Sequence, residues 1–157
     1  MKFILSLLMS LVPLICNSQD IDPLKYVNPL IGTDKMGHTY PGASVPFGMV
    51  QLSPDTDTLP YEVNGVYNRD VYKYCAGYQY EDHTIVGFSH THFSGTGHSD
   101  LGDILLMPTT GQLQLNPGTA DNPEKGYRSL FSHENEKASP GYYRSEERRV
   151  GKECRSR

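Results

Sequence analysis

Cysteine is scarce in this sequence of 157 residues, and the positions of its three cysteines exclude a disulfide framework. Cys16 lies in an apolar N-terminal run and Cys154 in a charged C-terminal segment, so only Cys75 belongs to the central part of the chain. A disulfide-stapled domain needs cysteines in pairs. A lone cysteine usually serves as a small hydrophobic side chain, and we expect Cys75 to be buried.

A basic stripe is also missing, which argues against nucleic acid as a partner. The whole chain has 14 basic and 18 acidic residues and a formal net charge of −4. Seven of the basic residues are Lys2 and six residues of 144–157, so residues 19–143 keep 7 basic against 15 acidic residues, a net charge of −8. Binding of nucleic acid requires clustered Lys and Arg to neutralise phosphates.

No apolar run is long enough for a comfortable membrane span, which needs about 20 residues. The apolar residues 3–16 instead follow the positive Lys2 and end in small residues, with Cys16 and Ser18 at the −3 and −1 positions of a cleavage after Ser18. This is the pattern of a secretory signal peptide. We predict that residues 1–18 are such a signal, that the protein is exported, and that no membrane contact remains after cleavage. A lipoprotein signal acylated at Cys16 is the alternative, and Ile15 before it disfavours that interpretation.

The last fourteen residues, RSEERRVGKECRSR (144–157), have dense charge and no apolar period. They resemble the one-frame translation of a sequencing-library adapter, whose first codons read Arg-Ser-Glu-Glu. A natural charged tail is the alternative. We expect residues 144–157 to lie outside the folded domain, and residues 19–143 to be an incomplete domain of a longer protein.

Short apolar or alternating runs between turn signals characterise residues 19–143. The runs are MVQLS (49–53), TIVGFSH (84–90), ILLMP (104–108) and GQLQLN (111–116), with Gly, Pro, Asn and Asp between them. No amphipathic helical period continues for ten residues. All eleven tyrosines and four of the five phenylalanines of the sequence lie here, and they suit the half-buried surface of a sheet. The pattern predicts an all-β sandwich.

The stretch GFSHTHFSGTGHSDLGD, residues 87–103, is the densest group of functional side chains. One interpretation is a metal site, since His90 and His92 in a strand would face the same side and imidazole suits zinc, copper or iron. His98 with Asp100 or Asp103 could complete it. A second interpretation is structural, with the histidines bonding buried backbone around a tight glycine turn.

A third interpretation is a surface that faces sugar. Aromatic rings stack on the apolar faces of sugars, and polar groups at the rim orient the hydroxyls. Tyr72, Tyr74, Tyr78 and Tyr80 lie just before the histidine stretch, and in an extended segment they would share one face. The residues alone leave the three interpretations open.

Four stretches between Tyr26 and Arg144 together resemble a known family. They are YVNPLIGTD, YPGASVPFGMVQLSPDT, CAGYQYEDHTIVGFSHTHFSGTGHSDLGDILLMPTTG and SPGYYR. In this order they are similar to the N-terminal domain of glycoside hydrolase family 92, a family of calcium-dependent, exo-acting α-mannosidases. The resemblance implies an N-terminal β-sandwich followed by an (α/α)6 catalytic barrel. The expected fold of residues 19–143 is therefore all-β, a partial N-terminal β-sandwich that lacks the barrel.

The resemblance also implies which domain of the parent protein carries the chemistry. The parent protein is expected to be an inverting α-mannosidase, of the α-1,2 type, that is periplasmic or extracellular. Its catalytic carboxylates and calcium ligands are expected on the barrel, so this chain is assigned no catalytic and no metal residue and is expected to be inactive alone. Its expected partners are mannose-containing glycans and its own barrel. The predicted substrate-binding residues are Tyr74, Tyr78, His90, His92, Ser94 and Gly95.

Two features limit this transfer from the family. Tyr74 stands where α-1,2-acting members often carry a tryptophan that helps form the leaving-group subsite, and His98 occupies a variable position. A stand-alone carbohydrate-binding β-sandwich module therefore remains an alternative to the enzyme fragment. A histidine-rich metal-binding protein is a further alternative.

Overall fold

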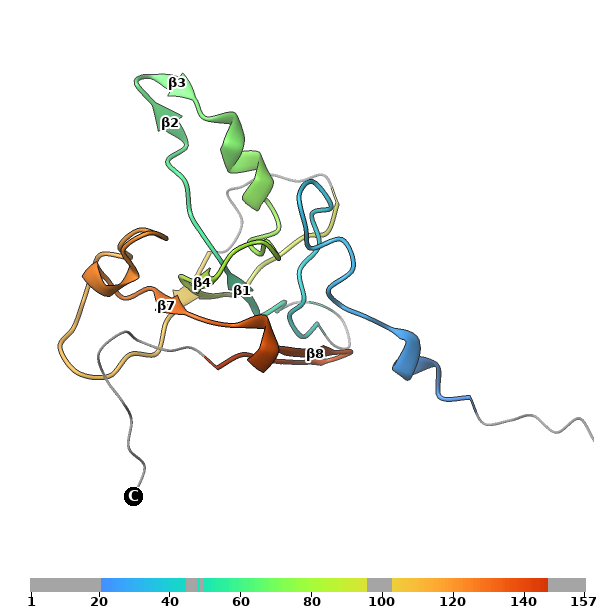
Figure 1. The fold of residues 1–157 in the computed structure, drawn as a ribbon. Helices are drawn as coiled ribbons and strands as arrows, with labels where there is room; N and C mark the ends of the chain where they lie inside the picture. Colours follow the sequence, from blue (N-terminus) through green and yellow to red (C-terminus); the bar gives the residue numbers. More distant parts are fainter. Residues whose placement is uncertain (1–20, 45–47, 49, 96–102, 147–157) are drawn as a thin grey trace, which may run out of the picture.

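The computed structural model of the protein describes residues 21–44, 48, 50–95 and 103–146 (Figure 1). The predicted signal peptide, residues 1–18, lies outside the described residues, as does most of the predicted tail. Arg144, the first tail residue, belongs to a strand and pairs with Lys137. Within the described ranges, no helix is long and apolar enough to cross a membrane.

Every regular element in the described part of the chain is short. Strands predominate, and the helical segments there are all of the 3₁₀ type. The strands are β1 (Ser53–Asp55), β2 (Glu62–Val63), β3 (Val66–Tyr67), β4 (Thr84–Ile85), β5 (Gly87–Ser89), β6 (Leu105–Leu106), β7 (Ser129–Leu130), β8 (Lys137–Ser139) and β9 (Tyr142–Arg144). The 3₁₀-helices are η1 (Pro23–Tyr26), η2 (Arg69–Tyr74), η3 (Pro123–Lys125) and η4 (His133–Asn135).

Two antiparallel ladders form the centre of the molecule. The first is the sheet β1-β5-β6, in which Ser53 pairs with Ser89 and Phe88 with Leu106. The second pairs β4 with β7. Only Val86 separates β4 from β5, and its N–H donates to the carbonyl of Asp55 at 2.8 Å. The two ladders are therefore joined directly through one continuous segment.

Two hairpins extend from this centre. Asn64 and Gly65 connect β2 to β3 with φ of 54° and 75°, the left-handed pair that a tight type I′ turn requires. This hairpin stands out from the body together with η2 (Figure 1). The hairpin β8–β9 contacts the central sheet, where the rings of Phe88 and Tyr143 meet edge to face at 6.3 Å.

The buried apolar core is small. Tyr78, Ile85 and Phe131 form it, with Leu30 and Phe88 packed against them. Buried polar side chains are more numerous than buried apolar ones among the described residues. The polar set is Thr33, His38, Gln51, Ser53, Thr56, Gln79, Thr84, Ser89, His92, Arg128 and Ser129. Because each such group is costly to bury without a partner, hydrogen bonds must specify much of this interior.

Thr56 is the best-connected of these buried groups. Its N–H donates to the Gly77 carbonyl at 3.0 Å, and its carbonyl accepts from Thr84 Oγ1 at 3.2 Å. Its hydroxyl donates to Asp82 Oδ2 at 2.6 Å and accepts from the Gln79 N–H at 3.0 Å. One fully buried residue thus ties the end of β1 to the 77–82 segment and to β4.

The predicted strands are only partly realised. Strands occur within 84–90 and 104–108 as expected, and the 49–53 run contributes the start of β1. The prediction of a strand over 111–116 is wrong for this structure, because these residues have no ladder partner among the described residues. Alternation supplies a face to bury, but a strand also needs a neighbouring backbone.

We predict that Thr56→Val lowers the free energy of unfolding by about 2–4 kcal/mol, because Asp82 and the Gln79 N–H both lose a buried partner. Thr56→Ser keeps the hydroxyl and loses a methyl group, so about 1 kcal/mol is expected. Exposed Thr58→Val serves as a control. Urea unfolding followed by far-UV circular dichroism measures all three. Equal losses for the valine and serine variants would contradict the assigned role of the hydroxyl.

Candidate functional site

Three segments of the chain meet, two of them loops and one the end of η2, and we call residues 34–38, 72–75 and 93–95 the loop junction. The Gly95 N–H donates to the carbonyl of His38 at 2.7 Å. The thiol of Cys75 lies 3.9 Å from the Gly95 carbonyl, and the ring of His38 meets Tyr72 edge to face at 4.7 Å. Cys75 is buried, as predicted. The junction therefore brings the 34–38 loop, the tyrosine segment and the histidine stretch together.

The 34–38 loop has an unusual backbone that its surroundings hold in place. Lys35 and His38 both lie in the left-handed region, with φ of 52° and 51°, which is unfavourable for side chains of this kind. The side-chain amide of buried Gln79 donates to the Lys35 carbonyl at 3.0 Å. Met36, at the tip, is 61% exposed. A strained loop fixed on its inner side and open on its outer side is typical of binding surfaces.

His92 is a buried anchor for the third loop. Its Nδ1 lies 2.6 Å from the carbonyl of Gln51, so Nδ1 carries a proton and donates there. Its Nε2 lies 3.0 Å from Ser89 Oγ and 3.2 Å from Asp55 Oδ1. The ring thus connects the histidine stretch to β1 and β5. The prediction that His92 binds substrate at the surface is not supported by this placement, because the side chain is enclosed.

The grouping of Ser89, His92 and Asp55 is not a nucleophilic triad. Serine and carboxylate approach the same ring nitrogen, whereas a triad needs them on opposite nitrogens. Gly77, which has a φ of +80°, packs against Asp55 and His92. A Cβ at this position would lie 2.1 Å from Asp55 Oδ1. Only glycine leaves room for this carboxylate and imidazole. The group therefore fixes loop geometry instead of activating a serine.

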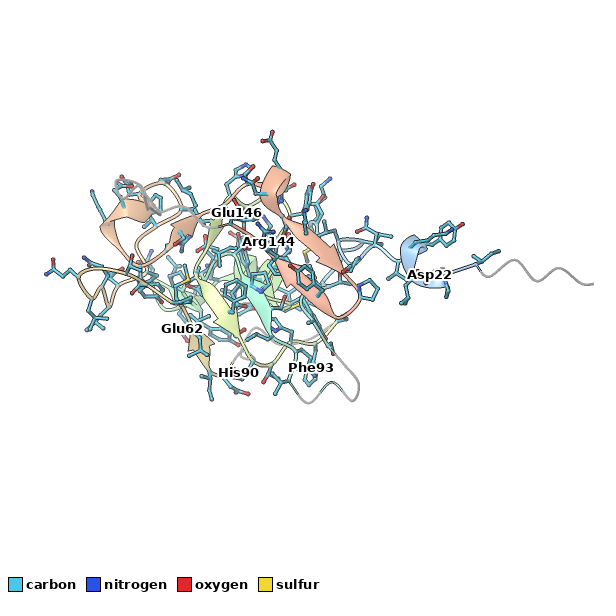
Figure 2. The ribbon with its side chains drawn as sticks, turned by 90° about the horizontal axis from the view of Figure 1, so that it is seen from below. Asp22, Glu62, His90, Phe93, Arg144 and Glu146 are labelled. Atoms are coloured by element: carbon cyan, nitrogen blue, oxygen red, sulfur yellow. The ribbon has the colours of Figure 1, made fainter. Side chains whose placement is uncertain are left out.

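His90 lies on the outer side of the histidine stretch. Its Nδ1 is 2.9 Å from the Ile104 carbonyl, and the neighbouring Thr91 hydroxyl donates to Asp103 Oδ2 at 2.9 Å. Figure 2 shows His90 and Phe93 at the same edge of the molecule. Phe93 is 54% exposed. This edge offers a ring nitrogen and an aromatic face to a ligand.

Ser94 and Gly95, at the end of the third loop, are exposed as a substrate-binding role requires. Tyr74 is half-buried, and its hydroxyl lies 3.4 Å from Asp82 Oδ1. Burial raises the pKa of Tyr74 well above its ordinary value, and the nearby Asp82 carboxylate raises it further. The phenol is therefore neutral and remains a hydrogen-bond donor.

The tyrosines do not share one face, which corrects the expectation of an extended segment. Asn68 caps the 3₁₀-helix η2, accepting from the Asp70 N–H, so Tyr72 and Tyr74 lie on a helix. Tyr78 points into the core and is completely buried. As placed in this structure it cannot contact a sugar, so its predicted role as a binding residue is not supported.

Tyr78 belongs instead to a group of side chains around the single carboxylate of Glu136, which the sequence analysis did not predict. Glu136 accepts hydrogen bonds from the hydroxyls of Tyr78 and Tyr143, both at 2.7 Å, and its other oxygen lies 2.7 Å from His133 Nδ1. The ring of His133 stacks on Tyr80 at 4.1 Å. The three partners of Glu136 are Tyr78, far away in the sequence, and His133 and Tyr143, on either side of it. No periodic pattern in the sequence indicates that these side chains meet.

Metal binding has no support in the described residues. Within them, no group of three or more His, Cys, Asp or Glu side chains could hold an ion. Of the residues that could complete a metal site, His98 and Asp100 lie outside the described residues. His92 is already bonded through both ring nitrogens.

The sequence matches the model of the glycosyl hydrolase family 92 N-terminal domain over residues 26–150. The chain belongs to this family. The all-β fold, as part of the family's N-terminal β-sandwich, is thereby confirmed.

Known relatives are much longer proteins. A family GH92 α-mannosidase from Bacteroides thetaiotaomicron, solved with mannoimidazole, is 49% identical, with a TM-score of 0.67 over 78% of this chain and 15% of that one. A GH92 inverting mannosidase from the same species is 28% identical, with a TM-score of 0.52 over 82% and 16%. A protein of Arthroderma benhamiae described as an uncharacterised secreted glycosidase is 33% identical over 124 residues, 78% of this chain and 14% of that protein.

We predict a steep loss of stability at alkaline pH that depends on Tyr78. Burial, and then the hydrogen bond to Glu136, raise the pKa of Tyr78 far above its ordinary value. The folded state therefore keeps a proton that the unfolded state loses above about pH 10. The stabilisation is complete below that pH and falls by up to about 1.4 kcal/mol per pH unit above it.

Urea unfolding between pH 7 and 11 tests this dependence. Tyr78→Phe should unfold more easily at pH 7, because Glu136 loses a donor, and its stability should fall less steeply above pH 10. Exposed Tyr61→Phe is the matched control and should follow the unmodified chain. A Tyr78→Phe curve parallel to the control across this range would contradict the assignment.

Proposed function

We propose that this chain is part of the N-terminal domain of an exported α-mannosidase, an inverting and calcium-dependent glycosidase of the α-1,2 type. Its role is to face the carbohydrate and the catalytic domain, and it performs no catalysis alone. The protein acts in the periplasm or outside the cell on mannose-containing glycans. Membership of the family, and relatives described as mannosidases or as a secreted glycosidase, support this proposal.

The loop junction is the observation that carries the proposed role. It presents half-buried Tyr74, exposed Ser94 and Gly95, and the ring of His90 at the neighbouring edge. The bond from Gly95 to His38 and the anchoring of His92 hold these groups in a fixed arrangement. A wall for one side of a sugar site needs aromatic and hydrogen-bonding groups that are positioned in advance.

Three partly buried carboxylates of the described chain have structural partners, which agrees with catalysis being assigned elsewhere. Asp57 pairs with Arg128 at 2.5 Å, Asp82 accepts from Thr56, and Glu136 accepts from two tyrosines. Each of these carboxylates is committed to a structural donor. Inverting hydrolysis needs an acid and a base on either side of one glycosidic bond, about 6.5–9.5 Å apart. We assign that pair to the catalytic domain that the family resemblance implies.

Calcium dependence is proposed for the longer protein only. Because the calcium ligands are assigned to the catalytic domain, no part of the role proposed for this chain depends on the ion. The exported, stand-alone sugar-binding module remains the competing function, and activity measurements separate the two.

We predict that the purified chain hydrolyses no mannoside, whereas the parent protein hydrolyses an activated aryl α-mannoside and loses this activity on chelation of calcium. The reason is that the catalytic pair and the calcium ligands are assigned to the catalytic domain. Colorimetric turnover at high protein concentration, with and without a chelator, measures both. Turnover by the chain alone, abolished by His90→Ala, would place catalysis in this domain, and a parent protein that binds mannosides without turnover would favour the module.

We predict that Tyr74→Ala in the parent protein lowers kcat/KM for a natural mannobiose more than for an aryl mannoside. Tyr74 is assigned to the leaving-group side, where loss of one aromatic contact costs about 10-fold. Tyr74→Trp should retain most of the activity. Exposed Tyr61→Ala, on the β2–β3 hairpin, is the control. Equal effects of Tyr74→Ala on both substrates would remove Tyr74 from the leaving-group side.

A further inference from the structure

Residues 111–116 expose the two most accessible leucines of the described chain. Leu113 is 73% exposed and Leu115 is 84% exposed. They alternate with Gln112 and Gln114, so in an extended segment the leucines face one side and the glutamines the other. Alternation of this kind is the pattern of a strand with one side in a core and one in solvent. Here the apolar side has nothing to cover it.

The backbone of this segment is equally unpaired. Among the described residues, 111–115 form no hydrogen bond through backbone or side chain. The segment is nevertheless not a loose end. It follows β6 closely, and its last residue is held in place. The carbonyl of Asn116, and that of Pro117 after it, accept from the N–H groups of Tyr127 and Arg128 at 2.9 and 3.3 Å. A segment that is tied to the fold at its end and has free backbone groups among the described residues can pair with another strand.

We propose that residues 111–116 form a β-strand that pairs with a strand from the remainder of the parent polypeptide, with Leu113 and Leu115 packed in the core this pairing creates. The inference rests on the proposed function, because it takes the longer glycosidase as the protein in which the chain acts. The partner is an extended segment with a matching apolar face, and it supplies backbone donors and acceptors to residues 112–116.

The length of the relatives favours this partner over others. The chain spans only 14–16% of the relatives, so most of each relative is polypeptide that can supply a strand. A sugar is a poor match, since carbohydrate sites use aromatic faces and polar groups and this segment offers neither a ring nor a charged side chain. A second copy of this chain could instead pair with residues 111–116 and substitute for the strand of the parent polypeptide. The hydrogen-exchange experiment below distinguishes these two partners.

Hydrogen exchange of the purified chain and of the parent protein tests the pairing. In the monomeric chain, the amides of residues 112–116 should exchange rapidly. In the parent protein, at least two alternate amides among them should exchange about 100-fold more slowly, because pairing along one edge engages every second N–H. Slow exchange in the monomeric chain, or rapid exchange in the parent protein, would overturn the proposal. Slow exchange that appears only on dimerisation of the chain, and not in the parent, would assign the edge to a second copy.

Substitutions within the same segment provide matched variants of equal charge. Leu113→Glu with Leu115→Glu should abolish the slow exchange in the parent protein and reduce its soluble yield several-fold. Gln112→Glu with Gln114→Glu adds the same charge on the opposite side and should leave both unchanged. Equal effects of the two pairs would contradict the assigned core side. Mannoside turnover is recorded in parallel, so a parent that hydrolyses mannosides with rapidly exchanging 112–116 refutes the strand and leaves the proposed function standing.

Discussion

The four hydrogen bonds of Thr56 are the contact on which the described fold depends most. They use every polar group of one completely buried residue and join β1, β4 and the 77–82 segment. A core of three buried apolar residues gives little directional information, since apolar packing tolerates many arrangements. Buried donors and acceptors tolerate few, because each unmet group costs about 1–3 kcal/mol. Polar pairing therefore selects the arrangement of these short strands.

The same network continues into the loop junction. Thr56 follows Asp55, which meets His92, and it bonds to Gly77, which leaves the space that Asp55 and His92 occupy. Gln79 bonds to Thr56 through its backbone and to the 34–38 loop through its side chain. The loops of the candidate site are thus fixed by the residues that fix the fold. This coupling suits a surface whose task is to position a ligand, and it leaves little freedom for groups that must move during chemistry.

The sequence predicted the all-β class and several strands, because turn residues and short apolar runs are local signals. The family came from the resemblance of four stretches to known sequences. Prediction failed where the deciding partner is distant. Tyr78 was predicted to lie at the surface. Its spacing in the sequence cannot show that Glu136, 58 residues later, accepts a hydrogen bond from its hydroxyl. His92 was predicted to bind a ligand because its actual partners are far away in the sequence. The carbonyl of Gln51 and the carboxylate of Asp55, which its ring contacts, lie about 40 residues earlier. The tyrosine segment was predicted to be extended because its tyrosines alternate with other residues. In the structure Asn68 caps the 3₁₀-helix η2, which contains Tyr72 and Tyr74.

Residues 111–116 represent the opposite kind of disagreement. There the local pattern predicts a strand, and the structure has a segment without a ladder partner among the described residues. Leucines at 113 and 115 gain nothing from exposure to water, whereas burial of each contributes about 1.5–3 kcal/mol. Alternating glutamines keep the other side soluble. A sequence that retains such a face while building its own interior largely from polar groups is consistent with a domain whose second layer comes from elsewhere in the polypeptide. The pattern and the structure agree once the partner strand is counted as part of the fold.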